Sequence, residues 1–180
     1  MYECDIVKLG IKTRAEYYTK PYDFVKKNYN IVYADFDGCT GFYNNNFYID
    51  YIPNFQKGGN ITFTIDNAYN KINEYFYYNK NKHNRNYVLN YGLFGENITM
   101  TALNYLDIII GDKIKYNNVI FEVIDYVKPD DRLNVIPFGY KWWEKINDES
   151  NEHYDLIDLI NFPGVCGYYA QIIKPGFLSL

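Results

Sequence analysis

Few residues in this chain have the types and spacing that catalysis requires. Acid–base or nucleophilic catalysis needs a nucleophile, a base whose pKa lies near neutrality, or a metal held by several ligands. The only two imidazoles are His83, in the segment NKNKHNRNYVLN, and His153, on a polar face of a predicted helix. Neither has a second ligand or a nucleophile at a recognised spacing, so both are expected to be solvated surface residues. The sequence therefore favours a protein that is not an enzyme.

The strongest candidate for a metal site is the pair Asp35 and Asp37 in the segment ADFDG. Two carboxylates at a turn could bind a hard cation, but the remaining oxygen ligands of a calcium loop are missing. An ordinary Asp-Gly turn ending at Gly38 is the favoured interpretation. Gly58-Gly59 is not followed by the Lys-Ser/Thr pair of a phosphate loop. These residues predict neither a metal nor a cofactor.

Composition limits the possible classes of protein. The 180 residues are 48% hydrophobic, enough for one core, and we expect a single domain over residues 1–180. A net charge of −4 argues against a protein that binds a phosphate backbone. The first residues, MYECDIVKLG, lack a basic region followed by an apolar run, and no apolar stretch is long enough for a membrane span. We therefore expect a soluble, non-secreted protein without a membrane partner.

Cysteine and tyrosine usage adds two expectations. The three cysteines are far apart and odd in number, which predicts reduced, mostly buried thiols: Cys4, Cys39 and Cys166. The aromatic content is 20%, with 22 tyrosines, and tyrosine is enriched at protein interfaces because its ring is apolar and its hydroxyl polar. The alternative is codon bias, because an AT-rich genome also produces many Asn, Tyr, Lys, Ile and Phe residues. Both interpretations stay open.

One β-hairpin can be assigned from side-chain chemistry. Asn117-Asn118 tolerates the positive φ of a two-residue turn between strands at 113–116 and 119–123. In this register Tyr116 faces Val119, and Lys113 faces Glu122 as a favourable charge pair. One face of the hairpin then carries Ile114, Tyr116, Val119, Phe121 and Val123. The whole hairpin unit is expected at about 106–128.

The other elements follow from periodicity and turn signals. Thr13–Glu16 fits a capping box and predicts a helix from about Arg14. Ile61, Phe63 and Ile65 alternate with threonines, which is typical of a half-buried strand. We further expect short strands within 30–51, a helix over 67–78, a helical insertion at about 148–161 and a final strand over 167–173. The predicted fold class is β-rich α+β, a small β-barrel or sandwich with two or three packed helices.

One family resemblance rests on four segments that occur in order. They are Gly95–Thr99 (GENIT), Ile110–Lys113, Phe121–Val123 and Gly164–Ala170. The segments resemble MOSC domains, β-barrels related to the C-terminal part of molybdenum cofactor sulfurases. The resemblance implies a bound pterin or molybdenum, to be lost on changing Asn97 or Gly95. Such domains usually carry a cysteine just after the proline that follows the Phe-Glu-Val strand, whereas Asp130 follows Pro129 here. The expected sulfur nucleophile is therefore missing at that position.

A second resemblance is to neck proteins of tailed bacteriophages, the stopper-like head-tail connectors. It rests on Gly111-Asp112, the hairpin strands with their Asn117-Asn118 turn, and the aromatic segment 140–142. This resemblance needs no catalytic residue and no cofactor, and it agrees with the tyrosine-rich, acidic composition. We therefore take a structural virion protein as the first hypothesis. A MOSC-type protein that binds a molybdenum-pterin-type or other small ligand is the alternative, and a host-directed accessory protein is a third possibility.

The connector hypothesis specifies partners and a location. Copies of the chain are expected to form a ring between portal and tail, to contact portal, adaptor or tail proteins, and to meet DNA only as the passing genome. The protein would be part of the virion, assembled in the host cytoplasm. The candidate interface residues are Tyr116, Asn117, Asn118, Tyr140, Trp142 and Trp143.

Overall fold

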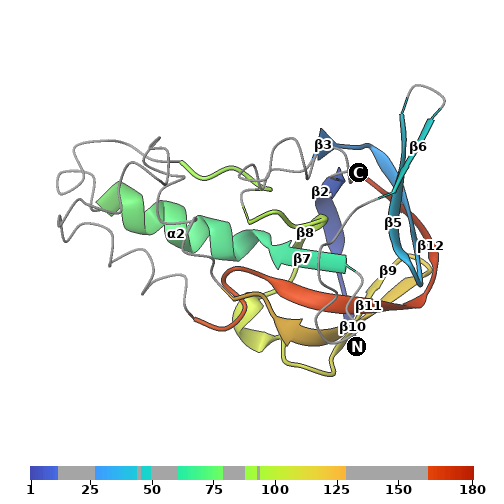
Figure 1. Ribbon diagram of the computed structural model, residues 1–180. Helices are drawn as coiled ribbons and strands as arrows, with labels where there is room; N and C mark the ends of the chain where they lie inside the picture. The colour runs from blue at the N-terminus through green and yellow to red at the C-terminus, as the bar shows by residue number, and fades with distance from the viewer. Residues whose placement is uncertain (12–26, 44–45, 50–60, 79–87, 93, 129–161) are drawn as a thin grey trace, which may run out of the picture.

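Two β-sheets make up most of the fold (Figure 1). The computed structural model describes residues 1–11, 27–43, 46–49, 61–78, 88–92, 94–128 and 162–180. The large sheet has the strand order β1-β9-β10-β11-β7-β8-β2-β3. Its strands are β1 (Tyr2–Glu3), β2 (Asp5–Ile11), β3 (Lys27–Asn28), β7 (Ile61–Ile65), β8 (Ile98–Thr101), β9 (Lys113–Tyr116), β10 (Val119–Tyr126) and β11 (Tyr168–Lys174).

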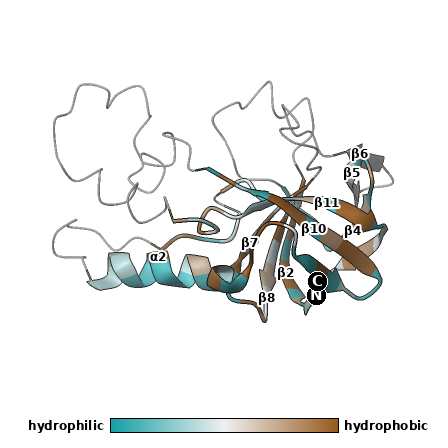
Figure 2. Cartoon of the chain, turned by 90° about the horizontal axis from the view of Figure 1, so that it is seen from below, coloured by the Kyte–Doolittle hydropathy of each residue, from teal (hydrophilic) through white to brown (hydrophobic). Residues whose placement is uncertain are grey.

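The small sheet lies at the end of the molecule opposite helix α2 (Asp66–Tyr78) in both Figure 1 and Figure 2. Its strand order is β12-β4-β5-β6. The strands are β12 (Gly176–Ser179), β4 (Ile31–Asp35), β5 (Gly38–Tyr43) and β6 (Asn46–Ile49). These are the short strands expected within 30–51. Asp35 pairs with Gly38 across the turn, and the Asp37 N–H donates to Asp35 Oδ1 at 2.9 Å, which confirms an ordinary Asp-Gly turn.

The large sheet does not close into a barrel, which corrects the more specific part of the predicted fold. The N-terminal segment pairs in parallel with β9 through β1 and antiparallel with β8 through β2. Between these two ladders, the Cys4 N–H donates to the Lys115 carbonyl at 3.1 Å. In the strand order, β1 and β3 are the two edge strands and are not paired with each other, so the sheet is open. The broader prediction, a β-rich α+β fold, is confirmed.

The hairpin of β9 and β10 has the register that the sequence predicts. Tyr116 lies opposite Val119, and Lys113 lies opposite Glu122. Asn117 has a φ of 50°, in the left-handed region that asparagine tolerates better than most residues. Beyond the predicted end, β10 continues to Tyr126 and pairs with β11 along its length.

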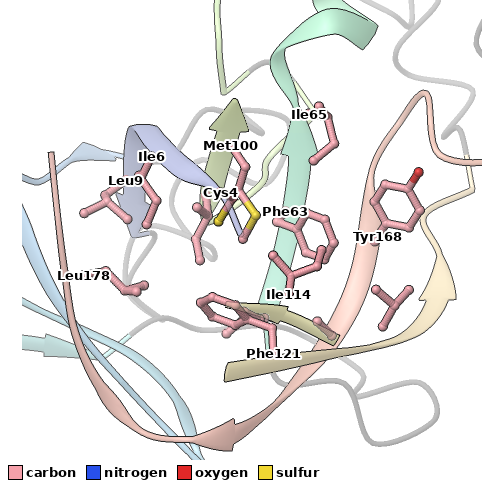
Figure 3. Close-up of a cluster of buried hydrophobic side chains, with 14 of the residues drawn as sticks. Cys4, Ile6, Leu9, Phe63, Ile65, Met100, Ile114, Phe121, Tyr168 and Leu178 are labelled. Carbon is pink, nitrogen blue, oxygen red and sulfur yellow. The ribbon is translucent and has the colours of Figure 1, made fainter. Parts of the chain in front are cut away.

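The core lies between the inner face of the large sheet and the small sheet (Figure 3). Phe63 of β7 and Tyr168 of β11 are fully buried, and their rings stack with centroids 4.9 Å apart. Leu178 of β12 is also fully buried and joins the same cluster, so the small sheet covers part of the large one. Burial of each large apolar side chain stabilises the fold by about 1.5–3 kcal/mol.

Helix α2 confirms the helix predicted over 67–78. Ala68, Tyr69 and Ile72 are buried, whereas Lys71 and Glu74 are exposed, as a 3.6-residue period requires. Besides this helix, the described part of the chain has one short 3₁₀ helix, η1 (Tyr105–Asp107). The helices expected from about Arg14 and over 148–161 lie outside the described residues. Among the described residues, no helix has the length and apolar character needed to cross a bilayer.

Candidate functional site

A row of polar side chains crosses the large sheet on the face opposite the core. Lys8 of β2 pairs with Thr99 of β8, and Thr99 pairs with Thr64 of β7. Side chains alternate along a strand, so these three residues face away from their inward-facing neighbours. We call Lys8, Thr99 and Thr64 the polar row. Lys8 is 5% exposed, and Thr99 and Thr64 are 0% exposed. The sequence predicts that β7 is half-buried, but at Thr64 this strand is covered on both faces.

The row ends at Gly167, the residue before β11. Gly167 has a φ of 103°, which strongly favours glycine. A Cβ there would lie 2.4 Å from the Phe63 carbonyl oxygen and 2.6 Å from Thr64 Oγ1. Glycine therefore lets this segment approach β7 closely, beside the hydroxyl of Thr64.

The carboxylate of Glu96 is bound above the row by one of its two oxygens. Glu96 Oε1 accepts hydrogen bonds from Tyr69 Oη at 2.8 Å, Thr99 Oγ1 at 2.8 Å and the Gly92 N–H at 2.7 Å. Burial and the neighbouring Glu96 charge raise the pKa of Tyr69 well above its ordinary value, so the phenol keeps the proton that it donates. Glu96 itself is 1% exposed.

The turn before Glu96 is held against α2 and against the row. The side-chain amide of Asn73 accepts from the Leu89 N–H at 2.6 Å and donates to the Leu89 carbonyl at 3.1 Å. Gly92 has a φ of 99°, and a Cβ there would lie 2.5 Å from Lys8 Nζ. The same ammonium donates to the Glu96 carbonyl at 3.2 Å. The glycine thus lets the backbone pass close to a buried positive charge.

Asn97 connects three neighbouring strands through its side-chain amide. Its Oδ1 accepts from the Thr62 N–H at 2.9 Å and from Thr62 Oγ1 at 3.1 Å. Its Nδ2 donates to the Gly10 carbonyl at 3.2 Å, and the residue is 1% exposed. The structure therefore gives Asn97 a structural role, whereas the family resemblance implies a ligand contact.

Two buried polar atoms of the site have no hydrogen-bond partner. They are Glu96 Oε2 and Thr64 Oγ1, both in the described part of the chain. A buried polar group without a partner costs about 1–3 kcal/mol, and more if it is charged. Most buried polar groups in proteins are therefore paired, and exceptions call for a functional explanation, a water or an ion. The arrangement is suited to bind a molecule that supplies the missing partners.

The thiols are not suited to nucleophilic chemistry. Burial, together with the nearby Asp5 charge, raises the pKa of Cys4 to about 12, and its Sγ lies 3.6 Å from the Lys115 carbonyl as a donor. Burial also raises the pKa of Cys166 to about 12. Cys39 is buried as well, so the predicted burial of all three free thiols is confirmed.

These pKa values predict a loss of stability at alkaline pH. In the unfolded chain the two thiols ionise near their ordinary value of 9.0, whereas in the folded protein Cys4 and Cys166 hold their protons up to about 12. Their contribution to the free energy of unfolding is therefore complete below pH 9 and is lost as the pH rises towards 12. Urea denaturation at pH 7, 9 and 10.5 should show this decrease. The double variant Cys4→Ala/Cys166→Ala should show a smaller one, and an unchanged pH dependence would contradict the assignment.

The candidate interface residues are not brought together with the polar row. Tyr116 is half-buried, and its hydroxyl donates to the Ser179 carbonyl at 2.7 Å, which connects the hairpin to β12. Asn117 and Asn118 are exposed at the turn. An interface role for this turn stays a prediction. The other singled-out residues lie outside the described part: Tyr140, Trp142, Trp143, His83 and His153.

The chain was compared with protein families and with curated proteins. The family model of the MOSC domain matches residues 58–180, more than half of the chain. The chain therefore belongs to the MOSC domain family. No curated protein matches it in sequence.

Three solved structures share the fold. The YUAD protein of Bacillus subtilis has a TM-score of 0.60 at 12% identity, over 98% of this chain and 91% of that chain. YiiM of Geobacillus stearothermophilus has a TM-score of 0.57 at 17% identity, over 98% and 71%. A crystallised hypothetical protein, for which no organism is named, has a TM-score of 0.59 at 15% identity, over 98% and 64%. The chain thus spans less than two thirds of the length of that last protein.

The bacteriophage hypothesis is wrong. The family match is to the MOSC domain, and YiiM and YUAD, which share the fold, are not named as connectors. The predictions that depended on it are wrong as well. They were a ring between portal and tail, contacts with portal, adaptor or tail proteins, passing DNA and a virion location. The hairpin on which this resemblance was based is present in the structure, but its turn and strand pattern is shared by hairpins of unrelated proteins.

Proposed function

We propose that this MOSC-domain protein binds a small polar molecule of the molybdenum-pterin type against the polar row. The observation that carries the proposal is the pair of unpartnered buried atoms, Glu96 Oε2 and Thr64 Oγ1. The ammonium of Lys8, which donates to the Glu96 carbonyl, belongs to the same polar row. In a pterin-type ligand, ring N–H and carbonyl groups would supply the missing hydrogen-bond partners. An anionic substituent of the ligand would lie at the Lys8 end.

The described residues fit the organic part of such a ligand better than its metal. Lys8, Thr64 and Glu96 offer a cation, a hydroxyl and a carboxylate oxygen to the ligand. The three thiols, Cys4, Cys39 and Cys166, are all buried, and burial raises the pKa of Cys4 and Cys166 to about 12. When bound, a molybdenum-pterin group supplies redox chemistry. This chain's described residues would hold and orient it, and we propose a binding role without a thiol-based reaction.

Replacing Thr64 with valine tests this proposal. Valine has nearly the same shape but lacks the hydroxyl, so one hydrogen bond to the ligand is lost. We expect native mass spectrometry to show a pterin-sized ligand on the wild-type protein, with an affinity about tenfold lower in Thr64→Val. Thr40→Val, on the small sheet, is the control and should retain wild-type affinity. A wild-type protein that neither carries nor takes up a pterin would refute the proposal.

A further inference from the structure

We infer that Glu96 recognises its ligand through an N–H donor of the ligand. Its Oε1 accepts hydrogen bonds from the protein, and its Oε2 accepts one from the ligand. The inference rests on the proposed function, because it names the group of the ligand that the same site selects. The ligand class is a nitrogen heterocycle or amidine that presents nitrogen-bound hydrogen to Glu96 Oε2. A ligand with only carbonyl or phosphate oxygens at this edge would be rejected.

Hydrogen bonds from the fold set the orientation of the Glu96 carboxylate. Its Oε1 accepts three hydrogen bonds from three separate segments, which are α2 through Tyr69, the turn through Gly92 and β8 through Thr99. Three donors at one oxygen fix the plane of the carboxylate and leave that oxygen no capacity for a ligand. The position of Oε2 is therefore determined by the fold before any ligand binds.

The missing partner of Glu96 Oε2 is a hydrogen-bond donor. An ionised carboxylate only accepts hydrogen bonds, so the group that completes Oε2 must be a donor. The residue is 1% exposed, and leaving this oxygen unpaired is costly in a medium of low polarity. A donor from the ligand removes that cost, whereas a carbonyl or phosphate oxygen adds repulsion. The site thus selects ligands in two ways: a donor at Oε2 gains a hydrogen bond, and a ligand oxygen there is repelled.

The two ends of the polar row differ in charge. Thr99 is the central residue of the row and donates to Glu96, with Lys8 on the neighbouring strand to one side and Thr64 to the other. The positive charge therefore lies on the β2 side and the unpartnered hydroxyl on the β7 side. A ligand with an anionic group and a nitrogen edge is bound in one orientation, with its anionic group towards β2.

Glu96→Gln is the variant that separates the two oxygens. The amide oxygen of glutamine can take the three hydrogen bonds of Oε1, so the fold is retained, while its NH₂ group replaces the acceptor Oε2 with a donor. The matched control is Tyr69→Phe, which removes one donor to Oε1 and leaves Oε2 in place. The probes are pterin and 1,3-dimethyllumazine, in which an oxo group replaces the 2-amino group and methyl groups replace both ring N–H hydrogens, so that no N–H donor is left.

Binding is measured by calorimetry, and folding by thermal denaturation. We expect the wild-type protein to bind pterin about 10- to 100-fold more tightly than 1,3-dimethyllumazine, the range of one charge-assisted hydrogen bond. Glu96→Gln should lose this preference and keep its Tm within a few degrees. Tyr69→Phe should lower the Tm and keep the preference.

The outcomes separate the inference from the proposed function. Equal affinity of the wild-type protein for both probes, unchanged in Glu96→Gln, would overturn the inference and leave the proposed function standing. Absence of binding to either probe would overturn the proposed function and the inference with it. A crystal structure of the pterin complex with only a water molecule at Oε2 would also overturn the inference.

Discussion

Gly167→Ala is expected to lower the free energy of unfolding by about 2–6 kcal/mol, the sum of a strained backbone conformation and an overpacked core. The new Cβ would lie 2.4 Å from the carbonyl oxygen of Phe63, a backbone atom of β7. Phe63 is fully buried and stacked on Tyr168, so β7 has no room to move away. The φ of 103° adds strain in any residue with a side chain. Urea denaturation followed by circular dichroism measures the loss.

Gly111→Ala is the matched control for this prediction. Gly111 has a similar φ of 92°, but a Cβ there would meet nothing within 4 Å. Its replacement tests the backbone strain alone, which costs about 1–3 kcal/mol. A loss at Gly167 no larger than that at Gly111 would show that the close approach to β7 is not part of the folded state.

Asn97→Leu is expected to destabilise the protein by about 3–6 kcal/mol. Leucine has a similar volume, but it leaves the Thr62 N–H without its acceptor and the Gly10 carbonyl without its side-chain donor. Each buried group left unpaired costs about 1–3 kcal/mol, and the hydroxyl of Thr62 also loses a bond. Equilibrium unfolding in urea measures this, and ligand affinity measured below the transition shows any separate effect on binding.

Asn104→Ala provides a comparison with an exposed asparagine. Asn104 caps η1 by accepting from the Leu106 N–H at 3.2 Å, and its replacement should cost about 1 kcal/mol. If Asn97→Leu were as mild as this and abolished binding, Asn97 would be a ligand contact, as the family resemblance implies. Loss of stability together with loss of binding would support the structural role.

The local elements of this fold were predictable because each depends on neighbours in the sequence. The Asn117-Asn118 turn and the cross-strand pair of Lys113 and Glu122 determine the hairpin register. A period of 3.6 residues identifies α2, and alternation identifies β7. The same locality misled the choice between two families. The hairpin pattern occurs in unrelated proteins, whereas the four segments that resemble MOSC domains, in their order along the chain, indicated the correct family.

The polar row and the open sheet were decided only by the tertiary structure. Lys8, Thr64 and Thr99 are far apart in the sequence, and no local signal marks Lys8 as a residue of the site. The parallel pairing of β7 with β8 and the antiparallel pairing of β8 with β2 place them side by side. Strand order depends on the free energy of all long-range contacts together, which local periodicity does not encode. The sequence by itself therefore determined the hairpin, β7, α2 and the inward-facing residues of these elements, whereas β2, β8 and β12 were not predicted. The order of those strands, and with it the unpartnered oxygen of Glu96, followed from packing.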